Sequence, residues 1–61
     1  MTYVRVRLAL DRLSTGQVLL VSLAGDEPNR NVPLTASEQG HAILAHEADP
    51  DGISQLWIRK G

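Results

Sequence analysis

Residues with the chemistry for catalysis or metal binding are scarce in this 61-residue chain, and cysteine is absent. Without a thiolate the chain offers no cysteine nucleophile, no thiolate metal ligand and no disulfide framework. His41 and His46 stand five positions apart in a segment expected to be a strand, so we expect their side chains on opposite faces. A shared metal ion is therefore not expected, and a structural or surface role is the simpler interpretation.

Carboxylates and hydroxyls give no better sign of catalysis. Asp49 and Asp51 belong to the sequence Asp-Pro-Asp-Gly, which is typical of a type I turn, and lack the apolar surroundings that general acid–base pairs use. Gly16 and Gly25 stand singly at the two ends of an apolar run and form no phosphate loop. The serines lack the context of a nucleophile elbow. We therefore predict no catalytic residue, metal or cofactor within these residues.

Length and composition predict one small domain over residues 1–61. A net charge of −1 and 43% hydrophobic residues suit a thin two-layer core. No apolar run reaches the roughly 18 residues of a membrane-spanning helix, and no signal-peptide pattern opens the chain, so we expect a cytoplasmic location and no membrane partner. Six basic and seven acidic residues give no general attraction for nucleic acid, whose direct binding is not expected.

Periodicity divides the first half of the chain into a helix and a strand. Residues 4–10 alternate as a strand would, but abundant Leu, Ala and Arg, an N-cap at Thr2 and a stop with Gly16 near the C′ position favour a helix over residues 2–13. Its apolar residues fall on two flanks, so we expect more than one surface to cover it. Residues 17–24 are a continuous apolar run, typical of a strand covered at least partly on both faces.

A second, short helix is expected in the middle of the chain. Residues 25–30 are rich in turn formers and predict a loop. Asn31 then suits an N-cap, and Pro33 is tolerated in a first turn because amides there have no helical partner. The helix is expected to run to about Gln39, with Gly40 ending it in the left-handed conformation.

Two strands, residues 41–48 and 53–60, flank the predicted turn and are therefore expected to pair antiparallel. Alternation places Leu56 and Ile58 on the core face of the second strand and Trp57 on its other face. The order helix, strand, helix, strand, strand predicts an α+β layer architecture.

Five short motifs follow one another along the chain. They are Leu-Ser-Thr-Gly-Gln-Val-Leu at residues 13–19, the apolar strand after it, Arg30-Asn31-Val32-Pro33, Gly40-His41, and a closing Leu-Trp-Ile-Arg-Lys that ends in Arg59 and Lys60. In this order they resemble the TusA/SirA-like sulfur-carrier family over essentially the whole chain, although the family usually has Arg-Asp-Ile-Pro at the third motif. The resemblance implies a two-layer sandwich of order β-α-β-α-β-β, akin to the C-terminal domain of translation initiation factor three, here α-β-α-β-β without the first strand.

Family members carry a Cys-Pro-x-Pro motif at the start of the first helix, and its cysteine bears a persulfide. Met1 and Thr2 align with its third and fourth positions, so the Cys-Pro pair would precede residue 1, and Thr2 replaces the second proline. A thiolate there would be stabilised by the positive end of the helix dipole. Two explanations stay open: Met1 lies inside a longer natural protein, or the short chain is a degenerate member that binds partners without carrying sulfur.

The resemblance implies a cysteine desulfurase as sulfur donor and an acceptor protein in tRNA thiolation or other sulfur trafficking. The alternative is a noncatalytic protein- or RNA-interaction or regulatory module that uses Trp57 and a basic patch including Arg5, Arg59 and Lys60. A large exposed aromatic side chain often marks an interface. We also expect a homodimer or a partly disordered N-terminus, because a missing first strand would leave a helix flank uncovered or a sheet edge with unpaired backbone groups.

Overall fold

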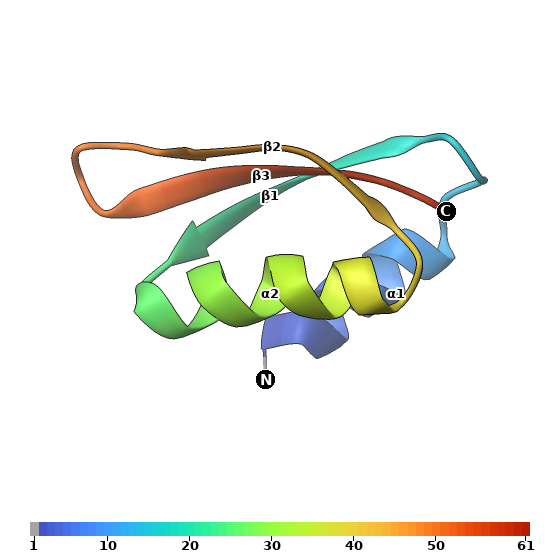
Figure 1. The fold of residues 1–61 in the computed structure, drawn as a ribbon, viewed down its shortest axis with the longest axis horizontal. Coiled ribbons are helices and arrows are strands. Elements are labelled where there is room, and N and C mark those ends of the chain that lie inside the picture. The colour runs from blue at the N-terminus through green and yellow to red at the C-terminus, as the bar shows by residue number, and fades with distance from the viewer. Residues whose placement is uncertain (1) are drawn as a thin grey trace.

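Two helices lie on one side of a three-stranded sheet in the computed structural model, which describes residues 2–61 and gives Thr2 by its backbone alone (Figure 1). β3 lies between β1 and β2 and pairs antiparallel with both. Neither described helix is long and apolar enough to cross a membrane. The predicted element order and the α+β layers are confirmed. The elements are α1 (Thr2–Asp11), β1 (Val18–Ala24), α2 (Asp26–Glu38), β2 (Ala42–Ala48) and β3 (Ile53–Arg59).

Buried aliphatic side chains join the helices to the inner face of the sheet. α1 contributes Val6 and Leu10, and α2 contributes Val32 and Ala36, each pair one helical turn apart. Burial of such side chains is the main favourable term in folding, at roughly 25 cal/mol per Å² of apolar surface. The strand residues of this core are Leu23, Leu56 and Ile58, so the predicted inward positions in β3 are confirmed.

α1 is a helix, as its composition predicted, and the structure covers one of its two apolar flanks. Val4 and Leu8 on the other flank are 50% and 58% exposed. The helix ends at Asp11, two residues earlier than predicted. Gly16 is therefore not its C′ residue; with φ at 93° it lies in the following turn, where its amide donates to the carbonyl of Lys60.

β1 is covered on one face only, which corrects the expectation of cover on both. Leu23 is buried on the inner side, whereas Val18 and Leu20 are 48% and 55% exposed on the outer side. Both helices lie on the inner side (Figure 1), and no element of residues 2–61 lies over the outer side. A continuous apolar run shows that a strand can be buried on both faces. It does not show that the chain has an element to pack against the second face.

α2 begins at Asp26, five residues before the predicted cap at Asn31, so the loop predicted over residues 25–30 was wrong. Gly25, at φ 92°, precedes the helix and provides no side-chain cap. The two acidic residues of the first turn instead complement the positive end of the helix dipole. Asp26 and Glu27, followed by Pro28 in the first turn, are therefore the sequence features that indicate the start of this helix.

Pro33 consequently lies inside α2 rather than at its start. A proline has no amide hydrogen, so the carbonyl of Asn29 receives no helical bond from it, a defect that costs about 3 kcal/mol in an ordinary helix interior. The neighbouring side chains of Val32 and Ala36 are fully buried in the core. Tertiary packing therefore overrides the local preference of proline.

The end of α2 follows the sequence prediction. Gly40 adopts φ 90°, and its amide donates to the carbonyl of Ser37 at 3.1 Å. The amide of His41 donates to the carbonyl of Ala36 at 3.0 Å. These two bonds define a Schellman motif, in which only glycine takes the left-handed position without strain.

The hairpin between β2 and β3 also forms as predicted. The amide of Gly52 donates to the carbonyl of Asp49 at 3.1 Å, and the amide of Ile53 donates to the carboxylate of Asp51 at 3.2 Å. The two aspartates therefore serve the turn. Beyond it, β2 contains a bulge: Ile43 pairs with Ile58 and Ala45 with Trp57, which leaves the residue between them extra.

The hydroxyl of Tyr3 is buried without a hydrogen-bond partner among the described residues. Burial raises the pKa of Tyr3 above its ordinary value of 10.0; Arg7 opposes the rise and Asp11 adds to it. The unfolded chain therefore loses this proton first as the pH rises past about 10, so the folded state loses stability in that range.

We predict that Tyr3→Phe leaves the free energy of unfolding unchanged or raises it by up to about 1 kcal/mol at neutral pH, because it removes an unpaired buried donor. Above pH 10 the free energy of unfolding of the variant should exceed that of the parent chain by a larger amount. Urea unfolding followed by circular dichroism at both pH values measures this. A less stable variant at neutral pH would show that the hydroxyl has a partner.

Candidate functional site

The N-terminal end of α1 is the place where the sequence resemblance puts the reactive group. Met1 and the side chain of Thr2 lie outside the described residues, and so does the predicted N-cap. The N-terminal end of α1 lies below α2 in this view, away from the C-terminus of the chain (Figure 1). Its first turn contains no acidic residue, and the exposed Arg5 follows within one turn. The dipole and this cation both favour an anionic group at the start of α1.

The residues that match the middle motif lie on α2, which packs against α1. Arg30 and Asn31 are exposed, and Pro33 is partly buried inside the helix. This helix and the end of α1 thus form one side of the molecule, opposite the sheet.

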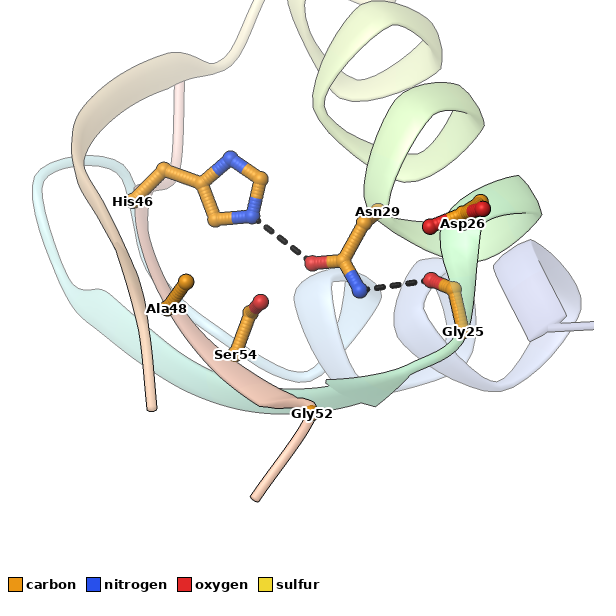
Figure 2. A pocket seen from close by; sticks show the side chains of 7 residues that line it. All are labelled: Gly25, Asp26, Asn29, His46, Ala48, Gly52 and Ser54. Carbon is orange, nitrogen blue, oxygen red and sulfur yellow. Dashed lines mark hydrogen bonds between the residues drawn. The ribbon is translucent and has the colours of Figure 1, made fainter. Parts of the chain in front are cut away.

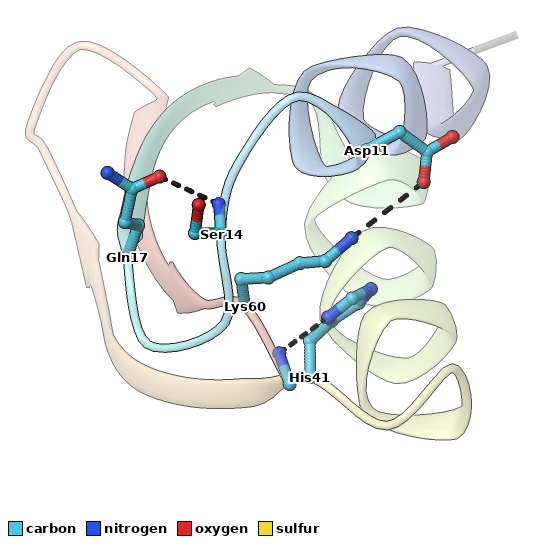
Figure 3. Close-up of polar contacts among 6 residues, drawn as sticks. Asp11, Ser14, Gln17, His41 and Lys60 are labelled. Atoms are coloured by element: carbon cyan, nitrogen blue, oxygen red, sulfur yellow. Dashed lines mark hydrogen bonds and ion pairs between the residues drawn. The ribbon is translucent and has the colours of Figure 1, made fainter.

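His41 and Lys60 come together at the other end of the molecule (Figure 3). The amide of Gly61 donates to Nδ1 of His41 at 3.1 Å. The backbone of Lys60 exchanges 2.8 Å bonds with Gly16 and Gln17. These contacts join the end of β3 to both preceding loops, so the motif residues here hold the fold together.

An ion pair and a side-chain bond complete this end of the structure (Figure 3). Lys60 Nζ lies 3.9 Å from Asp11 Oδ1, and the Asp11 side chain is well exposed, so the pair contributes little to stability. The amide of Ser14 donates to Oε1 of Gln17 at 2.8 Å and closes the loop between α1 and β1.

Trp57 projects from the outer face of the sheet, as predicted, because its neighbours in β3 are buried on the inner face. Arg59 lies on the same outer face by alternation and is exposed. Arg5 belongs to α1, on the inner side of the sheet. The structure therefore does not join the arginines of α1 and Arg59 into one basic patch, because the sheet separates them.

A hollow of about 410 Å³ lies between the start of α2 and the hairpin (Figure 2). The Asn29 side chain donates from Nδ2 to the carbonyl of Gly25 at 2.6 Å and bonds through Oδ1 to Nε2 of His46 at 2.9 Å. Ser54, 6% exposed, also lines the hollow. No group of three or more potential metal ligands occurs among the described residues.

The contact of His46 with α2 was not predicted, because it depends on the β2 bulge. His46 pairs with Leu56, whose side chain faces the helices, so the extra residue at Leu44 turns His46 to the inner side. The prediction that His41 and His46 lie on opposite faces rested on unbroken alternation along one strand. The bulge breaks this alternation, and His41 precedes β2, so the prediction does not hold. His41 and His46 nevertheless contact different groups, Gly61 and Asn29.

We predict that Asn29→Ala lowers the free energy of unfolding by about 1 kcal/mol, because the amide links the start of α2 to both Gly25 and His46. Asn31→Ala is the matched control, since Asn31 is exposed on the same helix and no side-chain bond of it is found in residues 2–61. Thermal unfolding of the two variants measures the difference. Equal stabilities would mean that the Asn29 contacts contribute nothing in solution.

Comparison with known proteins identifies the family of the chain. A family model described as Sulfurtransferase TusA matches residues 1–60. No match was found among curated proteins or among solved structures. The match covers the helices, the sheet and the closing Arg59-Lys60 segment alike. The chain therefore belongs to the TusA sulfurtransferase family.

Proposed function

We propose that this domain has the fold of a sulfur carrier that relays persulfide sulfur between a cysteine desulfurase and an acceptor protein, and that these 61 residues themselves hold no sulfur. The observation that carries the proposal is the family match over residues 1–60 in a chain without cysteine. Nucleophilic sulfur transfer needs a thiolate, which no residue of this chain provides.

The start of α1 is the proposed position of the reacting sulfur. A thiolate two positions ahead of Met1 would attack the terminal sulfur of a donor persulfide; the donor S–S bond would break and the donor would leave as a thiolate, with no net oxidation. The positive end of the α1 dipole and the cation of Arg5 would stabilise the thiolates of this reaction. The proposed setting is the cytoplasm, and tRNA thiolation is one use of the sulfur.

A second candidate function is that of an interaction module without sulfur chemistry. The observation that favours it is the uncovered outer face of the sheet, where Trp57 is partly exposed among exposed aliphatic residues. A protein partner on this face would need no cysteine in the chain.

The proposal predicts that a version with Cys-Pro added before Met1 becomes labelled when it is incubated with a cysteine desulfurase and sulfur-labelled cysteine. The parent chain and a Ser-Pro version should remain unlabelled, and a thiol reductant should release the label. The amount of label that stays with the protein on a non-reducing gel measures the transfer. A Cys-Pro version that binds the desulfurase without accepting label would support the interaction module instead.

In the Cys-Pro version, we predict that Arg5→Glu raises the pKa of the added thiol, because a carboxylate replaces the cation near it. Arg12→Glu is the matched control, since Arg12 is exposed just beyond the opposite end of α1. The rate of thiol alkylation as a function of pH measures both. Identical profiles for the parent and Arg5→Glu would remove Arg5 from the proposed site.

A further inference from the structure

All three strands expose apolar side chains on the outer face of the sheet. Val18 and Leu20 in β1 and Leu44 at the β2 bulge are about half exposed, and Ile53 in β3 is 38% exposed. Trp57 lies among them on the central strand. The pairing register places Leu20, Trp57 and Ala45 in one row across the sheet. No element within residues 2–61 covers this row.

One of the two rows that flank the Trp57 row is polar, and the other contains a single charged residue. One flanking row consists of Ser22, Gln55 and Glu47, with a 3.1 Å hydrogen bond between the side chains of Ser22 and Gln55. The opposite row consists of Val18, Arg59 and Ala42. The strand residues of the outer face thus include one acidic and one basic side chain, Glu47 and Arg59, on opposite sides of the Trp57 row.

We propose that this face binds a second copy of the chain, with the two sheets stacked about a two-fold axis that runs along the Trp57 row. This rotation exchanges the two flanking rows, so each Arg59 meets the row that contains the partner's Glu47. Two identical ion pairs then flank the stacked Trp57 and Leu20 side chains. A two-fold axis along the strands would instead place the two Arg59 side chains opposite each other.

Charge complementarity selects a second copy over other occupants. A nucleic acid or an acidic protein would meet Glu47 as well as Arg59, whereas a second copy satisfies both. The inference does not depend on the proposed sulfur chemistry, and it places the dimer contact on the sheet face rather than on the sheet edge.

The size of the face sets the expected strength of the dimer. Strands about 4.8 Å apart that rise about 3.3 Å per residue give a footprint of about 14 Å by 23 Å, well below the roughly 800 Å² per partner of a standard interface. We therefore expect a reversible dimer that forms as the protein concentration rises, not a permanent one.

Sedimentation velocity from about 10 µM to about 1 mM tests the proposal. The parent chain should shift from monomer to dimer in this range, and Arg59→Glu or Glu47→Arg alone should weaken the dimer about tenfold. The double variant should restore it, because the exchanged charges pair again. Arg30→Glu on α2 is the control and should leave association unchanged.

Three outcomes would overturn the inference. A parent chain that stays monomeric at the highest concentration would leave the face to a different partner. A dimer that tolerates both single charge reversals would use another surface, such as the Val4 and Leu8 flank of α1. A double variant that stays as weak as the single ones would exclude the Arg59–Glu47 pairing. Circular dichroism confirms that each variant is folded.

Discussion

The alternation of side chains along β3 is the constraint on which both surfaces of this protein depend. β3 is the central strand, so its inward residues Leu56 and Ile58 belong to the core that the helices cover, and its outward residues Trp57 and Arg59 define the free face. A shift of one residue in its pairing would bury a tryptophan and an arginine and expose the centre of the core. The aliphatic contacts of the inner face therefore also fix which residues a partner can meet on the outer face.

The molecule separates its possible roles in space. The start of α1, with Arg5 and the dipole, lies on the helical side. The contacts of His41, Lys60 and Gly61 lie at the end where both helices finish, and they hold loops together. The family-motif residues at this end thus maintain the fold. In a chain without cysteine, their retention is enough to keep the architecture.

Much of the fold follows from local patterns. The turn at residues 49–52 and the helix stop at Gly40 were predictable because each depends on a few neighbouring residues with restricted backbone angles. The start of α2 was not, because Pro33 is a poor helix residue locally and is held inside the helix by the burial of its neighbours. The contact between His46 and Asn29 was equally hidden, since it requires both the longer α2 and the β2 bulge. Motif order identified the family, whereas the open outer face of β1 required knowledge of where both helices lie.

The extra residue in β2 has a consequence for how relatives of this chain should be compared. Because Leu44 has no partner of its own in β3, the alternation of side chains is out of phase across the bulge: Ile43 and His46 both pair with inward residues of β3 although they stand three positions apart. A homologue without this residue would pair as a regular strand, keep its counterparts of Ile43, His46 and Glu47 on their present faces and lose only the side chain of Leu44. An alignment that ignores the bulge would therefore assign the residues on one side of it to the wrong face of the sheet.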